Sequence, residues 1–280
     1  MRTSTSSFEV LRQPGRAEQN QLSFARRERR TSVALGIAFP VVMLAIWELS
    51  TRTGLLSSFE FPAPSSIARD AFDTFRDNPR GNWWNDVGVS ARRIVWGYVL
   101  GAVPATVLGF AMGMSRHLRW LLEPTFNALY TVPKIALIGV FLIIFGFGER
   151  PLVVIVAVTV FFFVWIQTMA AAMATPANFK EAADSFGCSS WQKVRHVMLP
   201  AALPQVFVGY RIAAGVAVLT LVAAELVYAP GNEGIGFRIN NARQVLDNRQ
   251  AYVGLIVAGL AGLSFTALIR LLSRVLIRWQ

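Results

Sequence analysis

The chain has 280 residues, of which 54% are apolar and only 15% are charged, and its mean hydropathy is +0.46. This composition excludes an ordinary soluble domain of this length and predicts an all-α membrane protein with several spans. The net charge of +11 would suit nucleic-acid binding in a soluble protein. Here, however, the cations cluster at the ends of apolar segments rather than in a stripe with interleaved aromatic residues. We therefore expect a lipid bilayer, and no nucleic acid, among the partners of the chain.

Six apolar runs are long enough to cross about 30 Å of hydrocarbon as helices. Residues 1–32, which mix Ser, Thr, Gln, Glu and Arg, are predicted to be a disordered cytoplasmic tail. Residues 33–280 are predicted to form the transmembrane domain. Its spans lie near residues 33–49, 94–114, 121–147, 152–172, 206–226 and 251–269. Arginines precede the first span and flank the last, so the positive-inside rule places both termini in the cytoplasm.

The second span carries small residues at every fourth position, which are Gly97, Gly101, Ala105, Gly109 and Gly113. Such a row lets another helix backbone approach closely, so this helix is predicted to pack inside a bundle. In the third span, Pro133 removes a backbone hydrogen bond and predicts a kink or a break.

A polar segment separates the fourth and fifth spans and is predicted to form two short helices joined by a turn at Gly187. Pro176 is expected to start the first helix, and Ser189 with Gln192 forms a capping box for the second. Pro200 and Pro204 are expected to end the second helix before the fifth span begins. The charge pattern places this segment in the cytoplasm.

The same segment, residues 173–205, holds a spaced motif of Glu-Ala-Ala, three residues, Gly, nine residues, Ile, one residue, and Leu-Pro. The matching residues are Glu181, Ala182, Ala183, Gly187, Leu199 and Pro200, with Val197 in place of Ile. In this motif the chain resembles the permease subunit of ATP-binding cassette importers. Further matches resemble the branch that imports nitrate, sulfonates, taurine and related small solutes. They are Pro62, Pro64, Ser65, Ser90, Arg93, Gly97, Val132-Pro133-Lys134, Phe145-Gly146, Gly234 and Gly236.

The resemblance implies a type I importer permease fold with about six transmembrane helices in a bacterial inner (plasma) membrane. It implies that loop 173–205 inserts into a cleft on a separate ATPase subunit present in two copies, and that the permease pairs with a second copy of itself. The coupling role then falls on Glu181, Ala182, Ala183, Gly187, Leu199 and Pro200. An external solute-binding protein is expected to deliver solute near Trp83 and Gly234. The expected solute is an aliphatic sulfonate, taurine or a nitrate-like anion, and the alternative is a vitamin precursor such as a thiamine pyrimidine.

Three charged residues lie in or at the ends of apolar spans, namely Lys134, Arg211 and Glu225. A charge at mid-depth of a bilayer is costly, so each is a candidate for the pathway or its gate. Each of the three also has an alternative interpretation, a structural role that does not involve the pathway. Lys134 could cap a broken helix or attract an anionic solute, Arg211 could snorkel to the interface, and Glu225 could be an interfacial carboxylate at a helix end. Arg211 and Glu225 are expected on one face of their helix, because 14 positions return to nearly the same direction.

No phosphate-binding loop with a Gly-Lys-Ser or Gly-Lys-Thr end occurs, so we expect ATP hydrolysis on a partner rather than in this chain. The two histidines and one cysteine lack the spaced partners of a metal site or a nucleophilic triad, so no enzyme activity, cofactor or metal is expected. An ion-coupled secondary transporter is the rival from another class, and it predicts an inverted repeat that the sequence does not display. A membrane scaffold without transport is a third reading.

Overall fold

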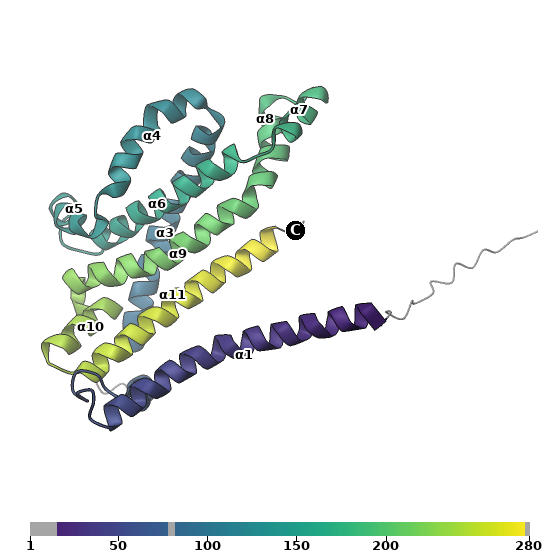
Figure 1. Ribbon diagram of the computed structural model, residues 1–280. Coiled ribbons are helices and arrows are strands. Elements are labelled where there is room, and N and C mark those ends of the chain that lie inside the picture. The colour runs from purple at the N-terminus through teal and green to yellow at the C-terminus, as the bar shows by residue number, and fades with distance from the viewer. Residues whose placement is uncertain (1–15, 78–81, 278–280) are drawn as a thin grey trace, which may run out of the picture. The chain divides into compact units, whose positions relative to one another are not determined.

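The computed structural model describes residues 16–77 and 82–277, and in these residues every regular element is a helix (Figure 1). The chain forms two compact units, residues 1–65 and residues 66–280. Five helices in the described residues are long and apolar enough to cross a membrane, and a bent pair provides a sixth candidate.

The first unit contains one long helix, α1 (Arg16–Arg52), whose apolar part is the candidate span Ala34–Arg52. Residues 16–32 are therefore helical where a disordered tail was predicted, and residues 1–15 of that tail lie outside the described residues. The segment 16–30 is rich in Ala, Glu, Gln and Arg, which favour helix and allow α1 to extend beyond its apolar part. At the other end of α1, Glu48 accepts hydrogen bonds from the backbone N–H of Ser65 at 3.0 Å and from Arg52 Nε at 2.6 Å.

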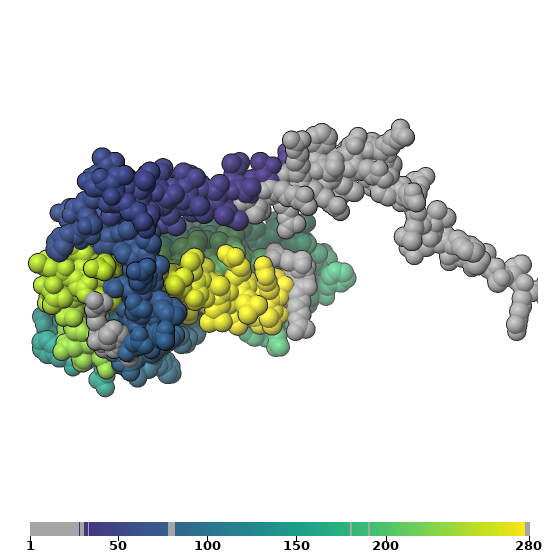
Figure 2. All heavy atoms as spheres, turned by 90° about the horizontal axis from the view of Figure 1, so that it is seen from below, coloured from purple at the N-terminus to yellow at the C-terminus, as the bar shows by residue number. Residues whose placement is uncertain are grey.

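The second unit is built on four long helices, α3 (Trp83–Met114), α6 (Arg150–Met173), α9 (Leu199–Val227) and α11 (Asn248–Leu276). In this unit α3 packs against α6, α6 against α9, and α9 against α11. Part of α11 is visible in Figure 2 (yellow), and many of the leucines of this helix are exposed. The predicted spans near 94–114, 152–172, 206–226 and 251–269 all fall inside these four helices.

The small-residue row on α3 faces α6, as predicted. A Cβ atom at Gly97 would lie 2.6 Å from Val156 Cβ, and one at Gly113 would lie 2.5 Å from Ala172 Cβ. Real Cβ atoms do not approach so closely, so the two backbones pack at a distance that only glycine permits. This contact fixes α3 and α6 as one rigid pair.

The predicted span at 121–147 is not one straight helix. It consists of α4 (Arg116–Thr131), a 3₁₀ turn η1 (Lys134–Leu137) and α5 (Ile138–Phe145), and the chain bends by 87° at the break. Val132 is extended, with φ −65° and ψ 129°, because the ring of a following proline disfavours helical backbone. The kink or break expected at Pro133 is thus confirmed.

Shorter elements complete the second unit. The helix α2 (Pro64–Asp77) precedes α3, and η3 (Pro230–Asn232) and α10 (Ile235–Gln244) connect α9 to α11. Gln250 of α11 donates to Thr74 Oγ1 of α2 at 2.7 Å. The helix α10 packs against α9 and α11. In Figure 1, α10 lies at one end of α9, and the segment containing α7 and α8 lies at the other.

Candidate functional site

The motif Glu181-Ala182-Ala183 lies on α7 (Ala177–Ser185), which begins directly after Pro176. Glu181 and Ala182 are exposed, whereas Ala183 is buried. The small side chain of Ala183 therefore faces the protein, and the first two motif residues are available to a partner.

The turn after α7 is formed by a left-handed glycine and by backbone hydrogen bonds to the end of the helix. Gly187 has a φ of +68°, a left-handed conformation in which a residue with a side chain is strained. Its N–H donates to Asp184 O at 2.9 Å, and the N–H of Cys188 donates to Ala183 O at 3.0 Å. These bonds satisfy the last carbonyls of α7, so the predicted cap at Gly187 is confirmed.

The second short helix is capped as predicted. The N–H of Ser189 donates to Gln192 Oε1 at 2.8 Å, and the N–H of Gln192 donates to Ser189 Oγ at 3.3 Å. Lys193 and Asp184 form an ion pair that bridges the two short helices. The segment therefore holds its shape through its own contacts.

The prediction that Pro200 and Pro204 end this helix is wrong, because both lie in α9 (Leu199–Val227). The helix α8 (Ser190–Lys193) continues through a π turn, η2 (Val194–Met198), into α9, which starts at Leu199 and includes Pro200 in its first turn. The N–H of Leu199 donates to Val194 O, five positions earlier. We infer that this wider turn makes room for the proline ring and its missing N–H, so the backbone continues instead of breaking.

Sequence reasoning missed the exposed aromatic residues of this segment. Phe179 is 50% exposed, Phe186 is 86% exposed and Trp191 is 68% exposed. Phe179 and Phe186 are seven positions apart, a helical spacing that could have drawn attention to both residues before the structure was known.

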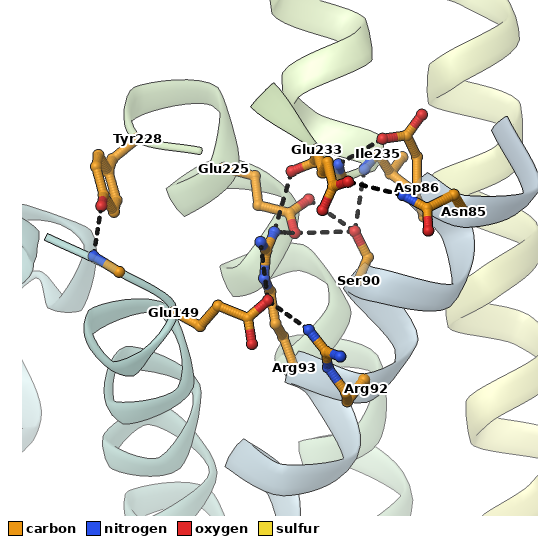
Figure 3. Close-up of polar contacts among 12 residues, drawn as sticks. Asn85, Asp86, Ser90, Arg92, Arg93, Glu149, Glu225, Tyr228, Glu233 and Ile235 are labelled. Atoms are coloured by element: carbon orange, nitrogen blue, oxygen red, sulfur yellow. Dashed lines mark hydrogen bonds and ion pairs between the residues drawn. The ribbon is translucent and has the colours of Figure 1, made fainter. Parts of the chain in front are cut away.

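At the opposite end of α9, Glu225 is the centre of a buried polar network (Figure 3). Its side chain is 0% exposed and pairs with Arg93, which is 1% exposed, at 2.8 Å between Oε1 and NH1. Ser90 Oγ donates to this carboxylate at 2.9 Å, and the N–H of Gly236 donates to it at 3.0 Å. The network joins α3, α9 and α10.

A second buried carboxylate, Asp86 on α3, holds the start of α10. The N–H of Gly234 donates to Asp86 Oδ1 at 2.8 Å, and Arg238 Nε pairs with Asp86 Oδ2 at 2.5 Å. The backbone of Ile235 donates to Ser90 Oγ at 3.0 Å. These five residues belong to two segments far apart in sequence, so their contacts fix α10 on α3.

Glycine is required where this network closes. Gly234 has a φ of +121°, and a Cβ atom there would lie 2.6 Å from Glu225 Cδ. At Gly236 a Cβ atom would lie 2.5 Å from Glu225 Cβ. The carboxylate thus reaches the backbone of α10 only because both positions lack a side chain.

The start of α6 joins the network through more exposed groups. Glu149, which is 42% exposed, pairs with Arg92 at 2.5 Å and with Arg93 at 3.5 Å. The N–H of Gly148 donates to Tyr228 Oη at 2.7 Å. The Gly148–Tyr228 bond connects the loop after α5 with the end of α9, and Arg93 NH1 also donates to Glu233 O, just before α10, at 3.1 Å.

The structure does not bring the three charged pathway candidates together. Glu225 is buried in the network just described, and Arg211 is partly exposed on α9, 14 positions earlier. Lys134 lies in η1, where its ammonium group donates to Tyr130 O and lies 5.1 Å from the ring centroid of Phe162. Lys134 thus caps the end of α4, which is one of the two roles that its position suggested.

The segments expected to receive solute do meet in space. Gly234 contacts Asp86, three positions after Trp83, and Asn85 Nδ2 donates to Glu233 Oε1 at 3.0 Å. Trp83 itself is buried, so its side chain lies inside this end of the bundle.

Comparisons with known proteins agree with this arrangement. Residues 97–280 match the family model described as binding-protein-dependent transport system inner membrane component. A Bacillus subtilis (strain 168) protein named for aliphatic sulfonates transport, SsuC, is 30% identical over 99% of this chain and 94% of its own length. The SsuC protein of Escherichia coli (strain K12) is 33% identical over 86% of this chain and 90% of its own length. An inward-facing structure of the MetNI methionine ABC transporter matches with a TM-score of 0.55 and 21% identity, over 70% of this chain and 92% of that chain, which shows the fold alone.

Proposed function

This chain belongs to the family of binding-protein-dependent transport system inner membrane components, and on that premise we propose that it forms the pathway of an importer for a small solute, namely an aliphatic sulfonate, taurine or a nitrate-like anion. It is a membrane permease of the ATP-binding cassette type, with the all-α fold of that class. The observation that carries the proposal is the spaced motif, with Val197 as its one departure, in an internally braced segment between α6 and α9 whose Glu181 and Ala182 are exposed. The other end of both helices closes in a buried network.

Residues 173–205 act as the coupling loop for a separate ATPase subunit. Glu181 and Ala182 are exposed for contact, and Gly187 fixes the turn that presents them. Leu199 and Pro200 connect the loop to α9 without a break, so a movement of the loop is passed directly to a span. One chain offers one such loop, and two ATPase sites therefore call for two copies of this permease.

The solute class follows from the relatives and from one cation. Relatives named for aliphatic sulfonates transport cover nearly the whole chain, which supports an aliphatic sulfonate or a related anion. Lys134 is a half-exposed cation at the break of a discontinuous helix, so it and Arg211 remain candidates for the pathway. Glu225 acts at the gate by holding the α10 end closed.

We assign the α7–α8 end to the cytoplasm and the α10 end to the external side of the inner membrane, with both termini inside. The cations around the coupling loop and near the termini support this orientation. An external binding protein then delivers solute to the segments around Trp83 and Gly234, which the Asn85–Glu233 hydrogen bond holds together.

Growth of a deletion strain on single sulfur sources tests the function. Without the chain, growth on alkanesulfonates or taurine is expected to fail while growth on sulfate continues, and the wild-type chain is expected to restore it. Glu181→Lys is expected not to restore it, because the reversed charge disturbs the exposed surface through which the ATPase moves the loop.

The controls separate the parts of the proposal. The amounts of the wild-type chain and of Glu181→Lys in the membrane are matched by immunoblot, so a failure of Glu181→Lys cannot come from lost insertion. Normal growth of the deletion strain on every sulfonate would refute the solute class. Full rescue by Glu181→Lys would refute the coupling role of that residue.

A further inference from the structure

An apolar groove runs between α3 and α11 and begins at the α10 end of the second unit. Ala91 and Val95 of α3 belong to one wall, and the groove has a volume of about 570 Å³. Val95 is 46% exposed and Leu260 on the other wall is 56% exposed, so the groove is a hollow in the surface of the unit. We call it the α3–α11 groove. Its α11 wall is a stripe with helical spacing, formed by Val257, Leu260, Ala261, Ser264, Phe265 and Leu268.

The last turn of α2 forms the mouth of the groove. Phe75 lines it, and the ring of Phe75 packs edge-on against Trp84, with 5.1 Å between the ring centroids. Trp84 Nε1 donates to Phe75 O at 3.3 Å, although the indole is 64% exposed. Tryptophans with an accessible ring and a bonded N–H are typical of the depth at which the hydrocarbon of a bilayer meets its headgroups. The mouth therefore has the chemistry of a membrane interface.

Charges of both signs lie beside this mouth. Arg76 and Asp77 end α2, their side chains are 69% and 66% exposed, and Arg76 Nε lies 3.7 Å from Asp77 Oδ1. Arg76 lines a smaller hollow that adjoins the groove, because Phe75 and Leu260 line both. Asp73, also exposed, adds a second carboxylate. An anionic headgroup would be repelled by these acids, whereas a zwitterionic headgroup offers a phosphate to the cation and an ammonium group to the carboxylates.

The length of the groove matches the depth of one leaflet. Leu268 follows Val257 by 11 positions in α11, which is about 16 Å along a helix. Half of the hydrocarbon core of a bilayer is about 15 Å thick. An acyl chain whose headgroup lies at Arg76 would therefore end near the middle of the membrane, where the groove also ends.

The groove is too small to hold another helix. A helix about 10 Å wide and 16 Å long occupies about 1,300 Å³, more than twice the volume of the groove. Neither α1 nor a span of a second copy therefore fits inside it. An acyl chain carries no side chains, and it can fill a narrow apolar hollow with van der Waals contacts.

We propose that the α3–α11 groove binds one acyl chain of a zwitterionic phospholipid, with the phosphate at Arg76 and the ammonium group at Asp77. The acyl chain then packs against Ile235, the first residue of α10, whose N–H donates to Ser90 Oγ in the buried network. A bound lipid thus stabilises the closed end of the bundle. The inference requires only that the chain spans a membrane, so it does not depend on the solute, the ATPase or the orientation.

A photo-reactive lipid tests the site on the full-length chain, purified in detergent and freed of its own lipid. The probe is phosphatidylethanolamine with a diazirine in one acyl chain, used in trace amounts together with an unlabelled competitor. We expect labelled peptides from both walls of the groove. Unlabelled phosphatidylethanolamine should prevent this labelling at a concentration about threefold or more below that of anionic phosphatidylglycerol. Equal competition by the two lipids would overturn the assignment of the headgroup.

Two pairs of variants locate the tail and the headgroup. Val95→Trp should lower labelling of the groove by about fivefold or more, because the indole occupies apolar surface that the acyl chain would bury. Val103→Trp is the matched control on the same helix, since Val103 is 58% exposed and lies outside the groove walls. Arg76→Glu should lower labelling by about fivefold, whereas Arg243→Glu, at an exposed arginine of α10, should not.

Thermal unfolding gives a second readout. Phosphatidylethanolamine should raise the unfolding temperature of the wild-type chain but not that of Val95→Trp, because a ligand stabilises only the fold that binds it. Ala261→Phe fills the groove from the α11 wall and replaces Val95→Trp if that variant does not fold. Equal labelling of Val95→Trp and Val103→Trp would overturn the proposal. Labelling spread evenly over the exposed helix faces, and insensitive to the competitor, would overturn it as well.

Discussion

Arg93 and Glu225 show how two residues 132 positions apart close one end of the bundle. The pair is fully buried, and the carboxylate also accepts bonds from Ser90 and from the backbone of α10. Removing one partner of a buried ion pair leaves the other charge without compensation, which typically costs about 3–5 kcal/mol. The free energy of unfolding should therefore depend strongly on this pair.

We expect Arg93→Leu to lower the free energy of unfolding by about 3 kcal/mol or more, because Glu225 keeps its buried charge without the guanidinium. The double variant Arg93→Leu with Glu225→Leu should lose less than the sum of the two single variants. Thermal unfolding of the purified chain in detergent measures both. Arg92→Leu is the control, since Arg92 is 55% exposed and its pair with Glu149 should contribute about 1 kcal/mol or less. Equal losses for Arg92→Leu and Arg93→Leu would contradict the structural role of the buried pair.

This network could not be predicted from the sequence. Glu225 stood out because it is a charge beside an apolar span, but its partners Ser90 and Arg93 are 135 and 132 positions away. Nothing local distinguishes Asp86, which is buried, from the other acids near the start of α3. The coupling motif, by contrast, is a spacing within 20 residues and was visible directly.

At the scale of elements, the spacing of glycines on α3 determines how closely that helix packs on α6. We expect Gly101→Ala to destabilise the protein by about 1–3 kcal/mol, because a Cβ atom would collide with the backbone of Ala157. Gly88→Ala is the same substitution on the same helix with nothing within 4 Å of the new atom, and it should stabilise by up to about 1 kcal/mol through helix propensity. Opposite shifts in the unfolding temperature are the expected result. Similar shifts for both variants would show that the glycine row does not determine the packing.

Five of the six predicted spans fall inside single helices of the expected type, because long apolar runs leave few alternatives in a membrane. Prolines were expected to interrupt the helical backbone at two places, and the expectation is confirmed at Pro133 and wrong at Pro200. Pro133 breaks its span by 87°, whereas Pro200 lies in a helix that continues through a π turn. Each proline lacks the backbone N–H that a helix would use as a donor. Whether the helix bends or forms a wider π turn then depends on the packing around it. The local sequence around a proline therefore does not show which of these two backbone geometries will form.

For the whole molecule, the proposed mechanism needs the two ends of α9 to face different compartments. One end carries a braced loop with exposed side chains, and the other closes on buried ion pairs. Alternating access requires that a change at the first end alters the second, and α9 connects them without interruption from Leu199 to Val227. The orientation of the chain in the membrane is therefore the premise that most needs a direct test.

The only cysteine makes that test simple. Cys188 is partly exposed in the turn after Gly187, so we expect a membrane-impermeant maleimide to label it only after cells that express the chain alone are permeabilised. In the background Cys188→Ser, a cysteine introduced by Phe147→Cys should be labelled in intact cells, because Phe147 is 87% exposed at the opposite end. Cys188→Ser without a new cysteine should stay unlabelled and controls for other targets. Labelling of Cys188 in intact cells would place the coupling loop outside, where no ATP is available, and would refute the proposed orientation.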